Sequence, residues 1–152
     1  MAPKRRNPVV ILLVEDSLAD QELIRRAVEK VKIPKELRIV EDGEEALAYL
    51  FRRGKYKVPA SSPKPDLLLL DLSLPRVNGY QVLEEIRADF KLRPMPVLVL
   101  TTSHQEKDII RSYELGCNSF FTKPAGLDQL TGLLQAIEKY WFETAVLPPK
   151  TE

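Results

Sequence analysis

The chain has 152 residues, 44% of them hydrophobic and 30% charged, which suits one domain with a real core and excludes disorder over the whole length. Its 23 basic and 22 acidic residues leave a net charge of +1, so bulk charge gives no reason to bind nucleic acid or an anionic membrane. The single cysteine, Cys117, and the single histidine, His104, exclude a disulfide framework and metal sites built from several such residues.

Five short apolar runs predict β-strands. In chain order they span residues 9–14, 37–40, 67–70, 96–100 and 119–122. Runs of this length that are rich in Val, Leu, Ile and Phe are typical of strands buried on both faces. Between the runs, apolar residues recur at helical spacing, so the sequence alternates strand and helix.

Local signals indicate where several helices begin and end. A hydroxyl or carboxylate followed three residues later by an acid predicts an N-terminal cap at three places. These pairs are Ser17 with Asp20, Asp42 with Glu45 and Ser103 with Glu106. Gly116 predicts a helix end, and the three prolines of residues 55–65 predict a surface loop. The last helix carries an apolar stripe that continues to Trp141.

This alternation predicts an α/β fold, in which a five-stranded parallel sheet carries helices on both faces. We expect one domain over residues 9–143, preceded by a disordered basic tail over residues 1–8 and followed by a C-terminal tail over residues 144–152. The apolar run at residues 9–14 is too short for a signal peptide or a membrane span. We therefore expect a cytoplasmic protein.

Polar residues that can carry chemistry follow four of the five strands. Glu15 and Asp16 follow the first strand, Asp71 the third, Thr101 the fourth and Lys123 the fifth. Ligands of open α/β sheets bind at the carboxyl ends of the strands, where neighbouring strands would gather these carboxylates. Crowded carboxylates repel one another and require a cation, and oxygen ligands without His or Cys favour Mg²⁺ or Mn²⁺. Such a pocket suits a phosphoryl group.

The motifs resemble the receiver domain of two-component response regulators. The resemblance covers residues 9–142 and depends on four motifs in this order, each of which would be weak alone. They are Glu15-Asp16 after the first strand, residues 66–75 with Gly79, residues 100–103 and residues 120–124. The resemblance implies a flavodoxin-like (βα)5 fold, a doubly wound parallel sheet with the strand order 2-1-3-4-5.

The resemblance also implies roles for single residues. Asp71 would be the phosphoacceptor, a carboxylate nucleophile that forms an acyl phosphate. Glu15, Asp16, Asp71 and the backbone carbonyl of Ser73 would hold Mg²⁺, with Mn²⁺ as a possible substitute. Lys123 would pair with a phosphoryl oxygen as a point charge.

Further residues would respond to the phosphoryl group or tune its lifetime. Thr101 would be the switch hydroxyl, and Phe120 stands where the family has its switch aromatic residue, although ordinary core packing is an equal alternative for Phe120. The Lys123–Pro124 bond is expected to be cis. Ser73 and Ser103 are expected to tune the hydrolysis of the acyl phosphate.

The loop at residues 55–65 and the segments 136–142 and 144–148 are similar to those of single-domain regulators that partner bacterial phytochromes. That subgroup implies a sensor histidine kinase, here a bacteriophytochrome, as the phosphodonor, and a homodimer. An exposed apolar set in the tail would form the dimer contact, with intrachain packing as the alternative. The set comprises Tyr140, Trp141, Phe142, Val146 and Leu147.

We therefore expect a stand-alone phosphoacceptor that signals by protein contact, binds neither nucleic acid nor membranes, and is no enzyme beyond self-phosphorylation and autodephosphorylation. Two other classes remain open. A degenerate receiver would act only as a constitutive binding module, which the intact Asp71 and Lys123 disfavour. A flavodoxin-like enzyme or nucleotide binder would need a glycine-rich or hydroxyl-rich loop after the first strand, where this chain has Glu15-Asp16.

Overall fold

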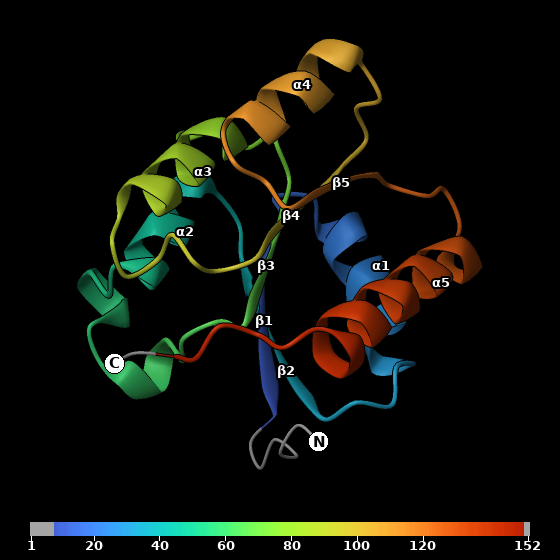
Figure 1. Cartoon of the computed structure of the whole chain (residues 1–152), viewed down its shortest axis with the longest axis horizontal. Helices are drawn as coiled ribbons and strands as arrows, with labels where there is room; N and C mark the ends of the chain where they lie inside the picture. Colours follow the sequence, from blue (N-terminus) through green and yellow to red (C-terminus); the bar gives the residue numbers. More distant parts are fainter. Residues whose placement is uncertain (1–7, 151–152) are drawn as a thin grey trace.

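The computed structural model describes residues 8–150, which form a five-stranded parallel sheet with helices on both faces (Figure 1). The strands are β1 (Val9–Val14), β2 (Lys35–Val40), β3 (Leu67–Leu70), β4 (Val97–Thr101) and β5 (Ser119–Thr122). The helices are α1 (Leu18–Glu29), α2 (Gly43–Leu50), α3 (Gly79–Ala88), α4 (Glu106–Glu114) and α5 (Leu127–Glu138). The strand order is β2-β1-β3-β4-β5, so the predicted flavodoxin-like order is confirmed.

The side chains of the central strands alternate between two hydrophobic cores, one on each face of the sheet. Leu68 and Leu70 of β3 belong to the core under α2 and α3, whereas Leu67 and Leu69 belong to the core under α1 and α5. Figure 1 shows α1 and α5 together on one side of the sheet and α2 and α3 on the other. Because β3 is covered on both faces, it reads in the sequence as an unbroken run of leucines.

Two of the three predicted helix caps are confirmed. The Ser17 side chain accepts a hydrogen bond from the amide of Asp20 at the start of α1, and the Asp42 side chain accepts one from the amide of Glu45 at the start of α2. The third is wrong, because α4 begins at Glu106 with Gln105 at its cap position. The Ser103 hydroxyl donates instead to a carboxylate further along α4.

Backbone hydrogen bonds of the sheet continue to residues that follow the strands. The amide of Asp71 donates to the carbonyl of Val14 at 3.1 Å, one step beyond the paired residues of β1 and β3. The amide of Lys123 donates to the carbonyl of Thr101 at 2.7 Å. These hydrogen bonds position the backbone of Asp71 and Lys123 at the carboxyl edge of the sheet.

The loop between α2 and β3 and the C-terminal tail both follow defined paths. The loop contains two short 3₁₀ turns, η1 (Gly54–Tyr56) and η2 (Pro59–Ser61), and the Tyr49 hydroxyl donates to the carbonyl of Pro63 at 2.6 Å. After α5, a π-helical turn η3 (Lys139–Thr144) leads into a segment that crosses the sheet at the end opposite the carboxyl edge (Figure 1). There Lys150 forms an ion pair of 3.1 Å with Asp66. Within residues 8–150, no helix has both the length and the apolar character needed to cross a bilayer.

Candidate functional site

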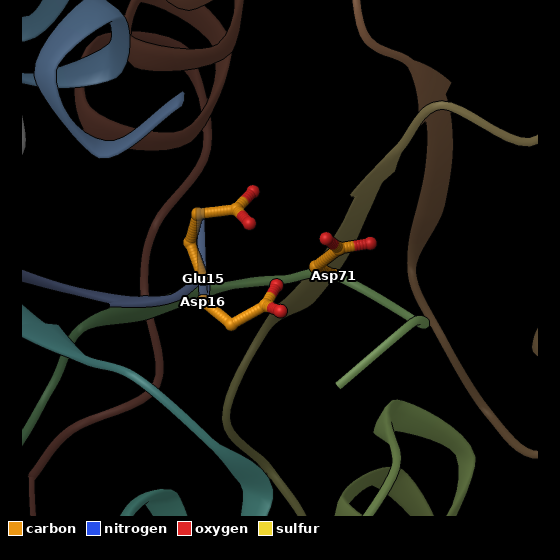
Figure 2. Close-up of side chains that lie close together, drawn as sticks. All are labelled: Glu15, Asp16 and Asp71. Atoms are coloured by element: carbon orange, nitrogen blue, oxygen red, sulfur yellow. The ribbon is translucent and has the colours of Figure 1, made fainter. Parts of the chain in front are cut away.

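Three carboxylates meet at the carboxyl edge of the sheet. Glu15 and Asp16 follow β1 and Asp71 follows β3, and Figure 2 shows their side chains projecting from these two strand ends into one region. Each offers a carboxylate oxygen within 4.8 Å of those of the other two. Glu15 is only 1% exposed and Asp71 only 7%, whereas Asp16 is exposed to solvent. The acidic cluster predicted from the sequence is therefore assembled in the structure.

Lys123 brings one positive charge to these carboxylates from the end of β5. Its ammonium group donates to Glu15, to Asp20 Oδ2 at 2.9 Å and to Asp71 Oδ2 at 3.2 Å. One lysine therefore ties together residues that follow β1 and β3 and a residue in the first turn of α1. This arrangement places the phosphoacceptor candidate Asp71 directly beside a fixed cation.

Burial and charge act in opposite directions on the ionisation of this cluster. Burial raises the pKa of Glu15 to about 7, against the hydrogen bond from Lys123 that lowers it. Burial alone would lower the pKa of Lys123, but its hydrogen bonds to Glu15 and Asp20 and the charge of Asp71 raise that pKa above its usual value. Lys123 is therefore charged at neutral pH, and one ammonium group serves several carboxyl groups at this edge of the sheet.

The donor set fits a hard divalent cation. Glu15, Asp16 and Asp71 offer only oxygen ligands, which is the chemistry that Mg²⁺ and Mn²⁺ prefer. A buried carboxylate whose pKa is raised by burial gains most from such an ion, because the ion replaces the lost solvation of its charged form. The predicted metal site therefore agrees with the residues that the structure brings together.

Asp20 is a site residue that the sequence reasoning missed. Its backbone amide donates to the Ser17 side chain, as the cap pattern predicts, but its carboxylate points to Lys123. The cap pattern concerns only neighbours along the helix and contains no information about a lysine that is 103 residues away. The first turn of α1 nevertheless lies at the carboxyl edge of β1, and that position could have indicated that Asp20 lies near the acidic cluster.

Asp71 is positioned by the start of the loop that follows it. The amide of Ser73 donates to Asp71 Oδ1 at 3.3 Å. Gly79, at the start of α3, packs so closely that a Cβ atom there would lie 2.3 Å from the Asp71 carbonyl oxygen and 2.7 Å from Leu72 Cα. Only glycine allows this approach of two backbone segments, which explains why the Asp71 motif includes Gly79.

The two predicted switch residues lie on β4 and β5. Thr101 is buried at the end of β4, and its hydroxyl oxygen accepts a hydrogen bond of 3.4 Å from the amide of Ser103. Phe120 is partly buried against the core under α2 and α3, and its amide donates to the Tyr113 hydroxyl at 3.2 Å. Core packing and a switch role therefore remain compatible for Phe120.

The expected cis bond before Pro124 is absent. No peptide bond in the described part of the chain is cis, so the Lys123–Pro124 bond is trans. The four methylene groups of a lysine let its ammonium group reach Glu15, Asp20 and Asp71 from this backbone. Trans is also the more stable isomer of most X–Pro bonds, by about 0.5–1 kcal/mol.

The predicted tail cluster divides into two groups. Trp141 and Phe142 pack against the core under α1 and α5, so part of the set is used within the chain. Tyr140 is 55% exposed and Val146 is 85% exposed, and Leu147 is partly buried. Tyr140 and Val146 are thus the tail residues that offer free apolar surface to a second molecule.

Comparison with known proteins agrees with this geometry. Residues 11–135 match the family model described as the response regulator receiver domain. Response regulator Rcp1 from Synechocystis sp. is 46% identical over 148 residues, which are 97% of this chain and 99% of that protein.

Two solved structures are similar over 93% of this chain. The phosphorylated cyanobacterial phytochrome response regulator RcpA has a TM-score of 0.86 with 46% identity over 99% of its length. The Mn²⁺-bound form of response regulator Rcp1 has a TM-score of 0.85 with 47% identity over 100% of its length. Matched in sequence, in strand order and in the acidic cluster at its sheet edge, the chain belongs to the response regulator receiver domain family.

Proposed function

We propose that the chain is a signalling switch that accepts a phosphoryl group on Asp71 from the phosphohistidine of a sensor histidine kinase. An Asp71 carboxylate oxygen forms the new P–O bond as the P–N bond of the donor breaks, and its electron pair leaves with the imidazole. The observation that carries this proposal is the placement of the Asp71 carboxylate 3.2 Å from the Lys123 ammonium group, within the acidic cluster. Membership of the receiver family supports it.

Glu15, Asp16, Asp71 and the Ser73 carbonyl would hold Mg²⁺, and Mn²⁺ could replace it. When bound, the ion supplies positive charge opposite the phosphoryl oxygens. The Mn²⁺-bound form of Rcp1, which is similar to this chain, supports a divalent ion at the acidic cluster.

Lys123 and Thr101 would donate hydrogen bonds to the phosphoryl oxygens. Lys123 would donate from its present contact with Asp71 to a phosphoryl oxygen, because its charge already lies beside the acceptor carboxylate. Thr101 would donate its hydroxyl hydrogen to another phosphoryl oxygen and shift the loop that follows β4. Hydrolysis of the acyl phosphate would reset the switch, and we propose no catalytic activity on other substrates.

The experiment that tests the proposal is phosphorylation by acetyl phosphate or by a kinase in the presence of Mg²⁺. We expect the intact mass of the wild type to increase by one phosphoryl group. Asp71→Asn should show no increase, and the matched variant Asp128→Asn, which changes an exposed carboxylate of α5, should behave as the wild type. Equal labelling of Asp71→Asn would refute the assignment, and an unlabelled wild type would favour a constitutive binding module.

We also propose that the phosphodonor is a phytochrome-type histidine kinase and that the output passes through protein contact. Two similar proteins support a phytochrome-type kinase as the donor, since RcpA is a cyanobacterial phytochrome response regulator and RtBRR is a bacteriophytochrome response regulator. Phosphotransfer from a purified phytochrome kinase that is no faster than from an unrelated kinase would contradict it.

A homodimer would be formed through the exposed tail residues. Tyr140 and Val146 lie in η3 and just after it, and both are more than half exposed. We expect the double variant Tyr140→Ser, Val146→Ser to weaken self-association at least about tenfold, because apolar residues at the centre of an interface carry most of its energy. Sedimentation equilibrium measures this, with Val58→Ser as an exposed control outside the tail. A dimer of unchanged affinity in the double variant would exclude these residues from the interface.

A further inference from the structure

Asp108 joins the loop after β4 to helix α3 through two hydrogen bonds, and neither contact belongs to the metal and phosphoryl site. The Ser103 hydroxyl donates to Asp108 Oδ2 at 2.5 Å, and the Tyr80 hydroxyl donates to Asp108 Oδ1 at 2.6 Å. Tyr80 is the second residue of α3, and Asp108 lies in the first turn of α4. We call Ser103, Asp108 and Tyr80 the polar latch.

The direction of these hydrogen bonds is fixed by the charge of Asp108. Hydrogen bonds from Ser103 and Tyr80 lower the pKa of Asp108, so it is a carboxylate at neutral pH and can only accept. Burial and the contact with Asp108 raise the pKa of Tyr80 to about 12, so Tyr80 keeps its proton and donates it. The Arg111 guanidinium, also on α4, lies over the Tyr80 ring at 4.1 Å from its centre.

Ser103 therefore has no hydroxyl hydrogen left for a phosphoryl group. A serine hydroxyl carries one hydrogen, and here that hydrogen is shared with Asp108, while the Ser103 oxygen accepts from the amide of Gln105 at 3.3 Å. Ser103 also donates its amide to the Thr101 hydroxyl oxygen at 3.4 Å. The residue that contacts the proposed switch hydroxyl is thus the same residue that the latch holds.

We propose that Asp108 is a positioning residue that holds the loop after β4, through Ser103, in the arrangement that disfavours phosphorylation, and that the latch transmits the state of Asp71 to the surface between α3 and α4. The inference rests on the proposed function. The Thr101 hydroxyl oxygen accepts from the Ser103 amide, so a Thr101 side chain that turns to donate its hydrogen to a phosphoryl group on Asp71 draws the Ser103 amide with it. The loop can then follow only if Ser103 releases Asp108 or pulls α4 with it. Release removes one of the two hydrogen bonds that fix the Asp108 carboxylate beside Tyr80, and a shift of α4 moves Asp108 relative to Tyr80.

The latch then shifts an equilibrium between two arrangements, because both of its hydrogen bonds to the charged acceptor are made together in only one of them. Removing the Ser103 or Tyr80 hydroxyl should favour the phosphorylated-like arrangement. Beryllofluoride, which substitutes for the phosphoryl group on a carboxylate, should then bind more tightly. We expect a gain of about fivefold for Ser103→Ala and for Tyr80→Phe, as the loss of about one net hydrogen bond would give.

The experiment is a titration of the full chain with beryllofluoride in the presence of Mg²⁺, followed by isothermal titration calorimetry. Tyr80→Phe and Ser103→Ala are compared with Tyr56→Phe, which removes the hydroxyl of a partly buried tyrosine outside the latch, and with Ser103→Thr, which retains the hydroxyl. The two control variants should bind within about twofold of the wild type. Because both latch variants act through Asp108, the double variant should gain no more than about the larger single effect.

The outcomes separate the latch from the proposed function. A wild type that does not respond to beryllofluoride and Mg²⁺ refutes the proposed function itself. A wild type that responds, with unchanged or weaker binding in both latch variants, refutes the latch and leaves the proposed function standing. Additive gains in the double variant also refute it, because independent contributions would not pass through one carboxylate. A purely structural contact would lower the unfolding temperature of the variants without tightening beryllofluoride binding.

Discussion

Lys123→Met should slow phosphoryl transfer to Asp71 by about a hundredfold to a thousandfold, the usual loss when one fixed donor to developing negative charge is removed. Methionine keeps the length and much of the apolar stem of lysine but brings no charge to Glu15, Asp20 and Asp71. The initial rate of phosphorylation by acetyl phosphate at saturating Mg²⁺ measures the effect. Lys57→Met, at an exposed lysine, serves as the control and should react at the wild-type rate.

The same variant should make the stability of the protein depend strongly on Mg²⁺. Without Lys123, the buried Glu15 and its acidic neighbours lose the ammonium group that contacts them, so unfolding in the presence of a chelator should require less denaturant. Added Mg²⁺ should restore more stability to Lys123→Met than to the wild type. Equal stabilisation of the two proteins, together with equal rates of phosphorylation, would show that Lys123 is not coupled to the acidic cluster.

Glu138→Gln should remove most of one carboxylate's contribution to the pH dependence of stability. Glu138, at the end of α5, is 2% exposed, and within residues 8–150 no hydrogen bond reaches either of its carboxylate oxygens. Lys35 faces it at 3.9 Å from the start of β2, and Glu143 faces it from η3. Burial raises the pKa of Glu138 from 4.5 to about 7, against the weaker attraction of Lys35.

The sign of this effect follows from the protons bound in each state. Between pH 4.5 and 7 the folded protein binds the Glu138 proton more tightly than the unfolded chain does, so the free energy of unfolding falls as pH rises through this window. The loss amounts to about 3 kcal/mol by pH 8. Urea unfolding from pH 5 to pH 8 should show a shallower decline in Glu138→Gln, whereas Glu114→Gln, at an exposed residue, should retain the wild-type slope. Glu15 contributes to the pH dependence of stability in the wild type and in both variants. A decline that is equally steep in Glu138→Gln and in the wild type would show that Glu138 does not cause it.

The sheet could be predicted closely because burial on both faces forces its central strands to be apolar throughout. The leucines at positions 67–70 and the aliphatic run at 9–14 have no other simple explanation in a chain of this length. The acidic cluster could be predicted for a related reason, since charged residues directly after buried strands can lie only at the edge of the sheet. Glu15, Asp16 and Asp71 were found in this way, and the structure confirms that they lie together.

What could not be predicted depends on contacts between segments that are distant in sequence. The cap predicted at Ser103 fails because α4 begins only at Glu106, and the Ser103 hydroxyl donates to Asp108, a carboxylate that also accepts from Tyr80, 28 residues earlier on another helix. Asp20 was assigned to its helix and not to Lys123 for the same reason. The division of the tail cluster between core and surface depends on where the turn after α5 leaves the helix, which helical periodicity does not encode.

The long sequence separation within the site has a consequence for how the protein is made. Lys123 binds Glu15 across 108 residues and Asp71 across 52 residues, so three strands must be in place before the cluster gains its cation. Contacts between residues so far apart in the sequence form late in folding, because chain entropy must be lost before they contribute stability. During synthesis, a nascent chain on the ribosome would expose its acidic strand ends without their lysine until β5 has emerged from the exit tunnel. The protein would therefore become competent for signalling only after nearly all of its domain has been translated.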